Sequence, residues 1–166
     1  MVVGSGLVFA LSIMRYFTGM CVQRRPPFLE GTMIDIKQHM QEHDSFARHL
    51  GMTIETAEQG YARVSMPLEP HLRNGVGIAH GGAIFSLADV AFGAAANAGL
   101  EHAVVTMSTN IVFLQPGRVS PLVAEARVVR QGQHLGQYEV TVRDGADTLV
   151  ARCQSGGFVT EIPLGA

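Results

Sequence analysis

Cysteine is scarce in this chain of 166 residues, which contains Cys21 and Cys153 and no others. The two lie far apart in dissimilar contexts, so neither a disulfide framework nor a cysteine-based zinc site is expected. The seven histidines are scattered along the chain and suggest no cluster of metal ligands. We therefore expect the protein to bind no metal.

Charge is sparse as well. Charged residues make up 16% of the sequence, the formal net charge is −2, and no long basic run occurs. Nucleic acid is therefore not an expected partner. Hydrophobic residues make up 47% of the sequence, which is enough for a core and excludes a disordered composition. The length suits one domain, or one domain with an appendage.

A membrane-spanning run of about 20 apolar residues is missing too. The apolar stretch Val2–Met14 is shorter and is interrupted by Arg15, and it lacks the basic start and cleavage site of a secretory signal. We expect residues 1–32 to be an extension that is disordered or not native, with Met33 as the alternative start. A weakly membrane-associating segment is the other interpretation. Residues 33–166 form the predicted domain, and a cytoplasmic location with no membrane partner is expected.

The hydrophobic pattern predicts a short helix over Ile34–Leu50, stopped by Gly51, and a long central helix over about 83–100. Between them we expect a strand over Tyr61–Met66, preceded by a turn at Gln59–Gly60. Four strands follow the long helix, at 102–114, 121–130, 135–143 and 147–159, with a hairpin turn at Asp144–Gly145. The short links predict a mostly antiparallel sheet and an α+β fold.

The long helix is apolar on two faces. At 100° per residue one face carries apolar or small side chains typical of a core: Ile84, Leu87, Ala88, Ala91, Ala94 and Ala95. The other face holds a single charge among small residues: Gly82, Ser86, Asp89, Gly93 and Ala96. A solvent-facing side would carry more charge, so we expect it to be covered from outside the chain's own sheet. A symmetric partner subunit is the expected cover.

Asp89 is the only acid in this helix, and burying an unpaired carboxylate costs several kcal/mol. It either bonds a hydroxyl or backbone group across the interface, or it is kept reactive at a site. Gly81 and Gly82 stand at the helix start, where free N–H groups can bind an anion or a developing oxyanion. Asp89 lies eight residues beyond Gly81, about 12 Å along a helix. Two antiparallel helices of a dimer could bring the two groups together in shared sites, with Gly93 leaving room for substrate.

The sequence resembles the hotdog-fold acyl-CoA thioesterases, and within them the phenylacetate-degradation branch. The resemblance covers about 44–159. It rests on Asn74…Gly77…His80-Gly81-Gly82…Ser86-Leu87-Ala88-Asp89…Asn97, followed by Asn110-Ile111…Phe113-Leu114-Gln115-Pro116-Gly117, and residues 129–159 also match the usual ending of that branch. It implies a curved, mostly antiparallel sheet wrapped around one long central helix, with a short N-terminal helix. It also implies a homodimer or a homotetramer built as a dimer of dimers, with no cofactor beyond the CoA of the substrate.

The resemblance implies roles for single residues. Asp89 matches the catalytic acid, either as nucleophile or as general base, and Gly81 matches the residue whose N–H polarises the thioester carbonyl. Asn74 matches the asparagine that orients water or the thioester, and His80 matches the motif histidine that organises the loop. A strand hydroxyl that positions water would be Thr106 or Ser108.

Further residues are expected around the substrate. Beside Gly82 and Gly93, the expected acyl pocket is lined by apolar side chains: Phe46, Leu50, Phe85, Phe92 and Met107. The CoA phosphates call for cations, for which the candidates are Arg73, Arg130, His134 and Arg152. A solvated surface charge is the alternative interpretation of each cation.

The expected activity is hydrolysis of an acyl-CoA or aryl-acyl-CoA, such as a phenylacetyl-CoA-like thioester, to the free acid and CoA. A medium-chain fatty acyl substrate is one alternative, and a non-catalytic acyl-CoA binding or sensing protein is another. A sensor would usually carry a DNA-binding segment, and residues 1–32 do not resemble one. A hotdog dehydratase would need an Asp–His hydration motif that the sequence lacks.

Overall fold

The computed structural model describes residues 34–165. The prediction for residues 1–32 lies outside the described residues. Within 34–165, no helix combines the length and the apolar character that crossing a membrane requires.

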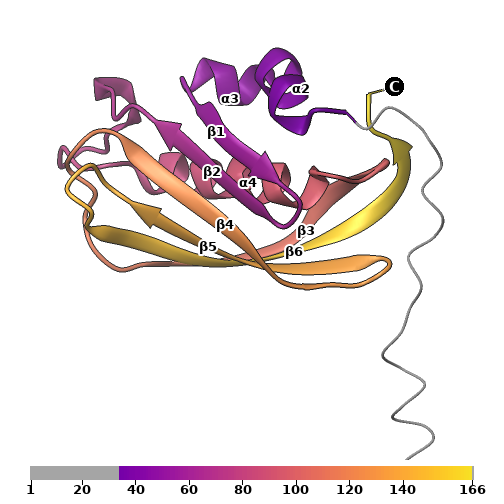
Figure 1. Cartoon of the computed structure of the whole chain (residues 1–166). Coiled ribbons are helices and arrows are strands. Elements are labelled where there is room, and N and C mark those ends of the chain that lie inside the picture. The colour runs from indigo at the N-terminus through magenta and orange to yellow at the C-terminus, as the bar shows by residue number, and fades with distance from the viewer. Residues whose placement is uncertain (1–33, 166) are drawn as a thin grey trace, which may run out of the picture. The chain divides into compact units, whose positions relative to one another are not determined.

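The described residues form one curved six-stranded antiparallel sheet with a long helix in its concave face (Figure 1). The strand order is β1-β2-β4-β5-β6-β3. The strands are β1 (Thr53–Glu58), β2 (Tyr61–Met66), β3 (His102–Phe113), β4 (Leu122–Gln131), β5 (Leu135–Arg143) and β6 (Leu149–Pro163). The helices are α2 (Ile36–His43), α3 (Ser45–His49), the short 3-10 helix η1 (Pro70–Leu72) and the central α4 (Gly81–Asn97).

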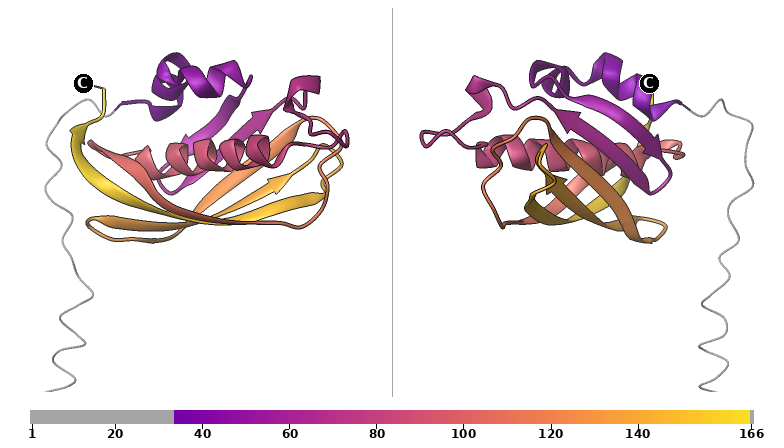
Figure 2. Two further views of the ribbon diagram at one scale, coloured as in Figure 1. Left: turned by 180° about the vertical axis from the view of Figure 1, so that it is seen from behind. Right: turned by 60° about the vertical axis from the view of Figure 1, so that its left-hand side comes forward.

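Small side chains bring the sheet close to α4. Ala88, Ala91 and Ala94 are fully buried in the face that meets the sheet, and the larger Leu87 and Phe92 are buried with them. The two further views show the strands curling around this helix, while α2 and α3 lie beside β1 (Figure 2). The arrangement is the hotdog fold, so the predicted fold class is confirmed.

The predicted single helix over 34–50 is wrong in one respect, because the chain breaks at Asp44. The Asp44 carboxylate accepts a hydrogen bond from Ala47 N at 2.9 Å and so caps α3, while its own N–H closes α2 on Met40 O. Asp44 stands between the two helices with extended backbone angles. A capping aspartate inside an amphipathic pattern therefore produced two short helices.

The strand β1 was missed by the sequence prediction, which placed one strand before the long helix. β1 pairs with β2 through the turn that was expected at Gln59–Gly60. Gly60 has φ +79°, and its N–H donates to Ala95 O at 3.1 Å, which ties the hairpin to α4. The run Thr53–Glu58 alternates only weakly, because its second half is half-buried on both faces.

The ends of α4 also differ from the prediction, because the helix runs from Gly81 to Asn97 rather than over 83–100. The early start follows from capping by His80, described below. The helix ends before Gly99, whose φ of +75° is incompatible with a further helical turn.

The predicted tight turn at Asp144–Gly145 is a five-residue loop, since β5 ends at Arg143 and β6 begins at Leu149. The buried Asp144 carboxylate organises it by accepting hydrogen bonds from four backbone N–H groups: Arg118, Val119, Ala146 and Thr148. Burial alone would raise the pKa of Asp144, but these four donors outweigh it and lower the pKa to about 2. The loop is longer than a two-residue turn because it is built around a side chain.

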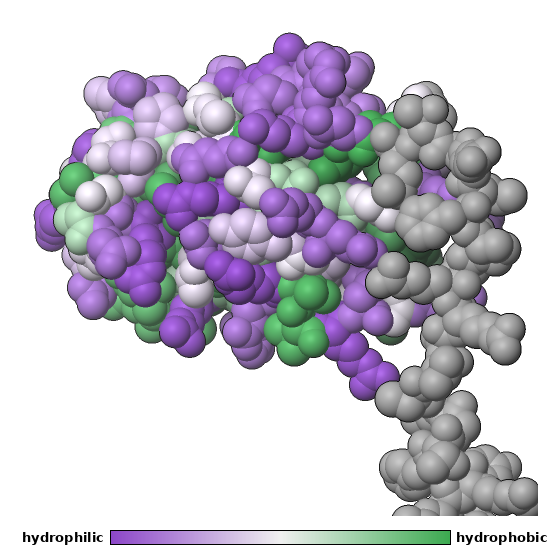
Figure 3. All heavy atoms as spheres, in the orientation of Figure 1, coloured by the Kyte–Doolittle hydropathy of each residue, from purple (hydrophilic) through white to green (hydrophobic). Residues whose placement is uncertain are grey.

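The face over β1, β2 and β4 is largely hydrophilic (Figure 3). Arg63 bridges Glu55 and Glu125, each at 2.6 Å, and Arg127 lies over the Tyr61 ring. The edge strand β3 is different, since four of its apolar side chains are about half exposed: Val105 (47%), Met107 (59%), Val112 (53%) and Phe113 (51%). Part of the exposed apolar surface therefore lies on β3, beside α4.

Replacing Asp144 by Asn should lower the free energy of unfolding by about 2 kcal/mol at neutral pH, because an amide donor would face the N–H groups of Arg118 and Val119. The folded pKa is depressed, so the contribution is full above the unfolded value of 3.8 and is lost as the pH falls through about 2. Denaturant unfolding between pH 2 and pH 7 measures this, with D147N as the exposed control. Equal stability of D144N and D147N at pH 7 would contradict the role of Asp144.

Candidate active site

A compact loop precedes α4 and is organised by Asn74. The Asn74 Oδ1 atom accepts hydrogen bonds from Val76 N at 3.1 Å and Ile78 N at 3.3 Å, and Asn74 N donates to Ile78 O at 2.8 Å. Gly77 adopts φ +79° in this loop and donates to Asn74 O. The carbonyl oxygen of Asn74 is thus committed to the loop, while its Nδ2 donors have no acceptor among residues 34–165.

His80 caps α4. Its Nδ1 atom accepts a hydrogen bond from Gly82 N at 2.9 Å, and Ile84 N donates to His80 O at 3.1 Å as the first helical bond. This geometry requires the tautomer in which Nδ1 has a lone pair. The Gly82 N–H is therefore occupied, whereas the Gly81 N–H has no acceptor within the described part of the chain.

The Gly81 N–H lies at a cavity of about 480 Å³. Its lining contains both apolar and polar residues: Asn74, Ile78, Ala79, Gly81, Ile84, Phe113, Leu114, Gln115, Pro116, Gly117 and Arg118. A Cβ atom added to Gly81 would lie 3.3 Å from Phe113 Cζ, so the aromatic ring packs directly over this glycine. An N–H donor without a partner of its own can bind a carbonyl oxygen.

Asp89 is partly exposed, two turns along α4 from Gly81. Thr106 of β3 donates from Oγ1 to Asp89 Oδ1 at 2.9 Å. No other hydrogen-bond partner of the Asp89 carboxylate occurs among residues 34–165. The second oxygen, Oδ2, is therefore available to a water molecule or a substrate.

A β-bulge aims Thr106 at Asp89. The register of β3 on β6 shifts between Thr106, opposite Gly157, and Ser108, opposite Gly156. A Cβ on Gly157 would lie 2.7 Å from the core residue Phe92, whereas a Cβ on Gly156 would lie 3.1 Å from Ser108 Oγ. Ser108 therefore points to the face of the sheet away from α4, and of the two predicted hydroxyls Thr106 is the one that meets Asp89.

Asn97 fastens the same strand to the end of α4. Its Oδ1 atom accepts from Val104 N at 2.7 Å, and its Nδ2 atom donates to Val104 O at 3.2 Å and to Gly93 O at 2.8 Å. The side chain is buried and fully bonded. Because Val104 lies two residues before Thr106, this clamp sets the position of the hydroxyl that holds Asp89.

The other predicted apolar residues fall into two groups. Phe92 is fully buried and packs edge-to-face on Tyr138 at 5.2 Å, so it belongs to the core. The exposed group is Phe46 (55%), Phe85 (39%) and Met107 (59%). A Cβ added to Gly93 would lie 3.8 Å from Met40 Cε of α2. The helix α2 therefore covers part of the α4 face that was expected to meet a partner. Leu50 is partly buried against the core.

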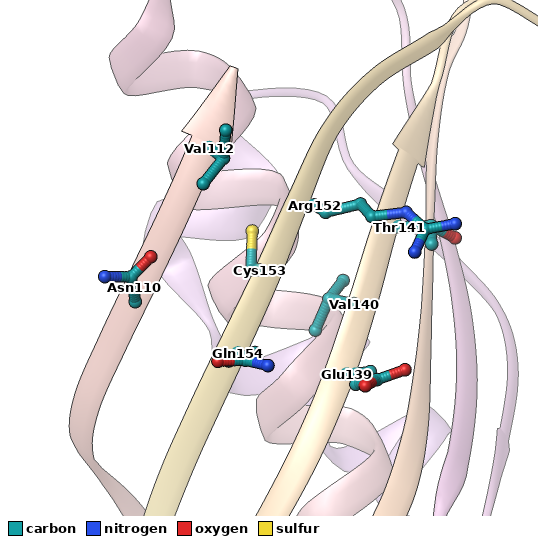
Figure 4. A pocket seen from close by; sticks show the side chains of 8 residues that line it. All are labelled: Asn110, Val112, Glu139, Val140, Thr141, Arg152, Cys153 and Gln154. Atoms are coloured by element: carbon teal, nitrogen blue, oxygen red, sulfur yellow. The ribbon is translucent and has the colours of Figure 1, made fainter. Parts of the chain in front are cut away.

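The predicted cations do not converge on Gly81 or Asp89. Arg73 donates to the backbone carbonyls of Gly77 and Leu68 and so supports the loop. Arg130 lies near the end of β4, and His134 stacks on Phe158 beside the β4–β5 hairpin. Arg152 lies in a separate cavity of about 320 Å³, among Asn110, Glu139, Thr141 and Gln154 (Figure 4). Its neighbours Ala151 and Cys153 are buried, so Arg152 faces away from α4.

One histidine pair escaped the sequence interpretation, because His39 and His43 have the HxxxH spacing of some metal sites. Their rings stack at 4.6 Å, and His43 Nδ1 bonds His39 O at 2.9 Å. Within residues 34–165, no group of three His, Cys, Asp or Glu side chains could hold a metal ion.

Most residues of the cavity were overlooked as site residues, Phe113 and Arg118 among them. Phe113 belongs to the quoted Phe-Leu-Gln-Pro-Gly stretch but was assigned no role, and Arg118 follows that stretch directly. Nothing in the local pattern shows that Phe113 reaches Gly81 across about 30 residues of sequence.

Comparisons with known proteins identify the family of this chain. The thioesterase superfamily matches residues 76–151. The acyl-coenzyme A thioesterase PaaI of Escherichia coli K12 is 39% identical over 114 residues, which are 68% of this chain and 80% of that protein. The structure of E. coli PaaI, from the phenylacetic acid degradation operon, has a TM-score of 0.72 at 32% identity and covers 77% of this chain and 95% of its own.

A third similar protein is smu.793 of Streptococcus mutans, whose structure contains bound acetyl CoA. It has a TM-score of 0.61 at 28% identity and covers 66% of this chain and 88% of its own.

Replacing Asn97 by Ala should lower the free energy of unfolding by about 2–3 kcal/mol, because the buried N–H and C=O of Val104 would lose their partners. Thermal or urea unfolding measures the loss. Asn110→Ala is the control, since Asn110 is an exposed asparagine on β3, the strand to which Asn97 is bonded. An equal effect of the two substitutions would show that Asn97 is not a clamp.

Proposed function

Because the chain belongs to the thioesterase superfamily, and within it to the acyl-CoA thioesterases, we propose that it cleaves acyl-CoA at sites shared between two subunits. Each site combines the Gly81 N–H of one subunit with Asp89 of the other. The observation that supports this most is the Gly81 N–H, which has no acceptor among residues 34–165 and belongs to a cavity-lining residue, together with the Asp89 carboxylate, which accepts from the Thr106 hydroxyl.

The chemistry follows from these two groups. The thioester oxygen accepts a hydrogen bond from Gly81 N–H, which stabilises the negative charge that develops on it during attack. As a general base, Asp89 takes a proton from water while the water oxygen bonds to the carbonyl carbon. When the C=O bond re-forms, the C–S bond breaks and the sulfur leaves as thiolate, which is protonated to free CoA.

As a nucleophile, Asp89 would attack the carbon itself. The CoA thiolate would then depart, and the acyl group would remain joined to Asp89 as an acid anhydride. Water hydrolyses this anhydride to the free acid and the original carboxylate. In either route Oδ2 is the reacting oxygen, because Thr106 holds Oδ1. Asn74, with its Nδ2 donors on the same cavity as Gly81, orients water or the thioester.

The distance between Gly81 and Asp89 is the argument for a shared site. Gly81 and Asp89 are about 12 Å apart along one helix, which is too far for both to touch one carbon. The exposed apolar side chains of the edge strand β3 favour its pairing with a second copy of β3. Such pairing brings two α4 helices side by side in opposite directions. A dimer of dimers is the larger assembly that we propose.

The substrate class that we propose is an aryl-acyl-CoA similar to phenylacetyl-CoA, with medium-chain fatty acyl-CoA as the alternative. Similarity to PaaI supports the first, and the apolar side chains of Ile78, Ile84 and Phe113 suit either acyl group. Acetyl CoA bound to the streptococcal relative supports CoA itself as the carrier.

Replacing Asp89 by Asn should reduce kcat by at least about 10³-fold, because the amide can neither accept a proton nor attack. Thiol release from a panel of acyl-CoAs, followed with a thiol reagent, measures this, and D147N serves as the carboxylate control. Retained turnover in D89N would sink the assignment. CoA binding without thiol release by the wild type would instead favour a sensing protein.

The role of Gly81 can be tested by removing its N–H donor. Proline is well tolerated at the first position of a helix, and His80 already has the extended backbone that precedes proline. Gly81→Pro deletes the N–H donor and should lower kcat by about 10²–10³-fold. Gly81→Ala keeps the donor and adds only a Cβ near Phe113. Equal losses in the two variants would assign the effect to crowding.

Mixing the G81P and D89N proteins tests the sharing of sites. A mixed dimer would have one site with both substitutions and one with neither. Statistical mixing should therefore restore about one quarter of wild-type activity, since half of the dimers are mixed. Absence of any recovery, in a mixture shown to exchange subunits, would place both groups in sites within one chain.

A further inference from the structure

Arg118 is held rigidly beside the start of α4. The preceding Gly117 accepts a hydrogen bond from Ala79 N at 2.9 Å and packs so closely that an added Cβ would lie 3.2 Å from Ala79 Cβ. Arg118 N and Val119 N both donate to Asp144 Oδ2, at 3.0 and 3.2 Å. The Arg118 backbone is thus fixed directly to Asp144 and, through Gly117, to Ala79, which lies two residues before Gly81.

The charge of Arg118 is not neutralised by a neighbour. Asp144 is the acid that touches the Arg118 backbone, but its oxygens are occupied by the four N–H groups. Among residues 34–165, no carboxylate forms an ion pair with the Arg118 guanidinium. Some other arginines form ion pairs, since Arg63 pairs with two glutamates and Arg143 pairs with Asp147. Arg118 is distinguished from other uncommitted arginines by lining the Gly81 cavity.

The lining of the cavity is chemically mixed. Phe113 and Ile84 supply apolar side chains beside Gly81, while Arg118, Gln115 and Asn74 supply polar groups in the same lining. An occupant that matches both kinds of lining has an apolar part and an anionic group. A purely apolar occupant would match only the first kind.

We infer that Arg118 binds an anionic oxygen group of the substrate and thereby selects which thioesters are hydrolysed. The group is a phosphate of CoA or a carboxylate at the far end of the acyl group. A guanidinium suits both, because its planar N–H donors match two oxygens of either anion. This inference rests on the proposed function and names a cation outside the four that the sequence suggested.

The effect should fall on KM. Arg118 touches no reacting atom, so its bond to the anion is equal in the ground state and the transition state. Loss of such a bond raises KM and leaves kcat unchanged. A merely structural role would instead lower stability and affect all substrates alike.

The experiment compares Arg118→Gln and Arg118→Lys with wild type on matched substrates. One pair carries the same neutral acyl group on CoA and on pantetheine, which lacks the phosphates. The second pair is a neutral acyl-CoA and an acyl-CoA of equal length ending in a carboxylate. Arg48→Gln is the control, since Arg48 is an exposed arginine on α3.

If the anion is a phosphate, R118Q should raise KM at least about 10-fold on both CoA thioesters and not on the pantetheine thioester. If it is the acyl carboxylate, the rise should appear only with the carboxylate-bearing substrate. R118K should fall between R118Q and wild type. Unchanged KM throughout, or an equal change on all substrates, overturns the inference.

Direct binding separates this inference from the proposed function. Calorimetry with free CoA and with a dicarboxylic acid needs no turnover. Weaker binding of either by R118Q in a protein that releases no thiol would retain Arg118 as an anion-binding residue and reject hydrolysis. Normal hydrolysis with identical parameters in R118Q would reject Arg118 alone.

Discussion

The rise of an α-helix fixes the geometry on which the proposed site depends. Gly81 and Asp89 stand on one continuous helix of 17 residues, so their separation of about 12 Å cannot be adjusted by side-chain rotation. A loop could bend to bring a donor and a carboxylate together, but a packed helix cannot. The two groups can therefore act on one atom only if a second helix supplies one of them. The catalytic proposal and the dimer proposal are for this reason a single hypothesis.

Packing makes this helix rigid enough to serve as a scaffold. Fully buried alanines let the sheet curl closely around α4, and the Gly60 N–H reaches Ala95 O from the β1–β2 turn. Asn97 then joins the last turn to β3, and the bulge opposite Gly156–Gly157 directs Thr106 at Asp89. The helix α4 carries the Asp89 carboxylate, and the strands β3 and β6 help to position it.

Sequence reasoning identifies candidate residues where the chemistry is local. Asp89 stands out as one acid in an apolar helix, and Gly81–Gly82 mark a helix start, so both could be found by inspection. His80 was missed as a cap because its hydrogen bond with Gly82 depends on a ring orientation. Phe113 and Arg118 were missed because only the folded chain brings them to Gly81. β1 was missed because its half-buried residues weaken the period-two pattern that reveals strands.

The β5–β6 loop has an unusual constraint for a surface connection. Hairpin loops commonly tolerate insertions, because nothing but their own ends depends on their length. Here the first loop residue, Asp144, also holds the backbone of Arg118 and Val119 from a distant part of the chain. An insertion that displaced Asp144 would therefore also displace Arg118 and change the lining of the Gly81 cavity. Among descendants of a common ancestor, the length of this loop should therefore vary less than its exposure suggests, and changes in it should accompany changes in the accepted acyl-CoA.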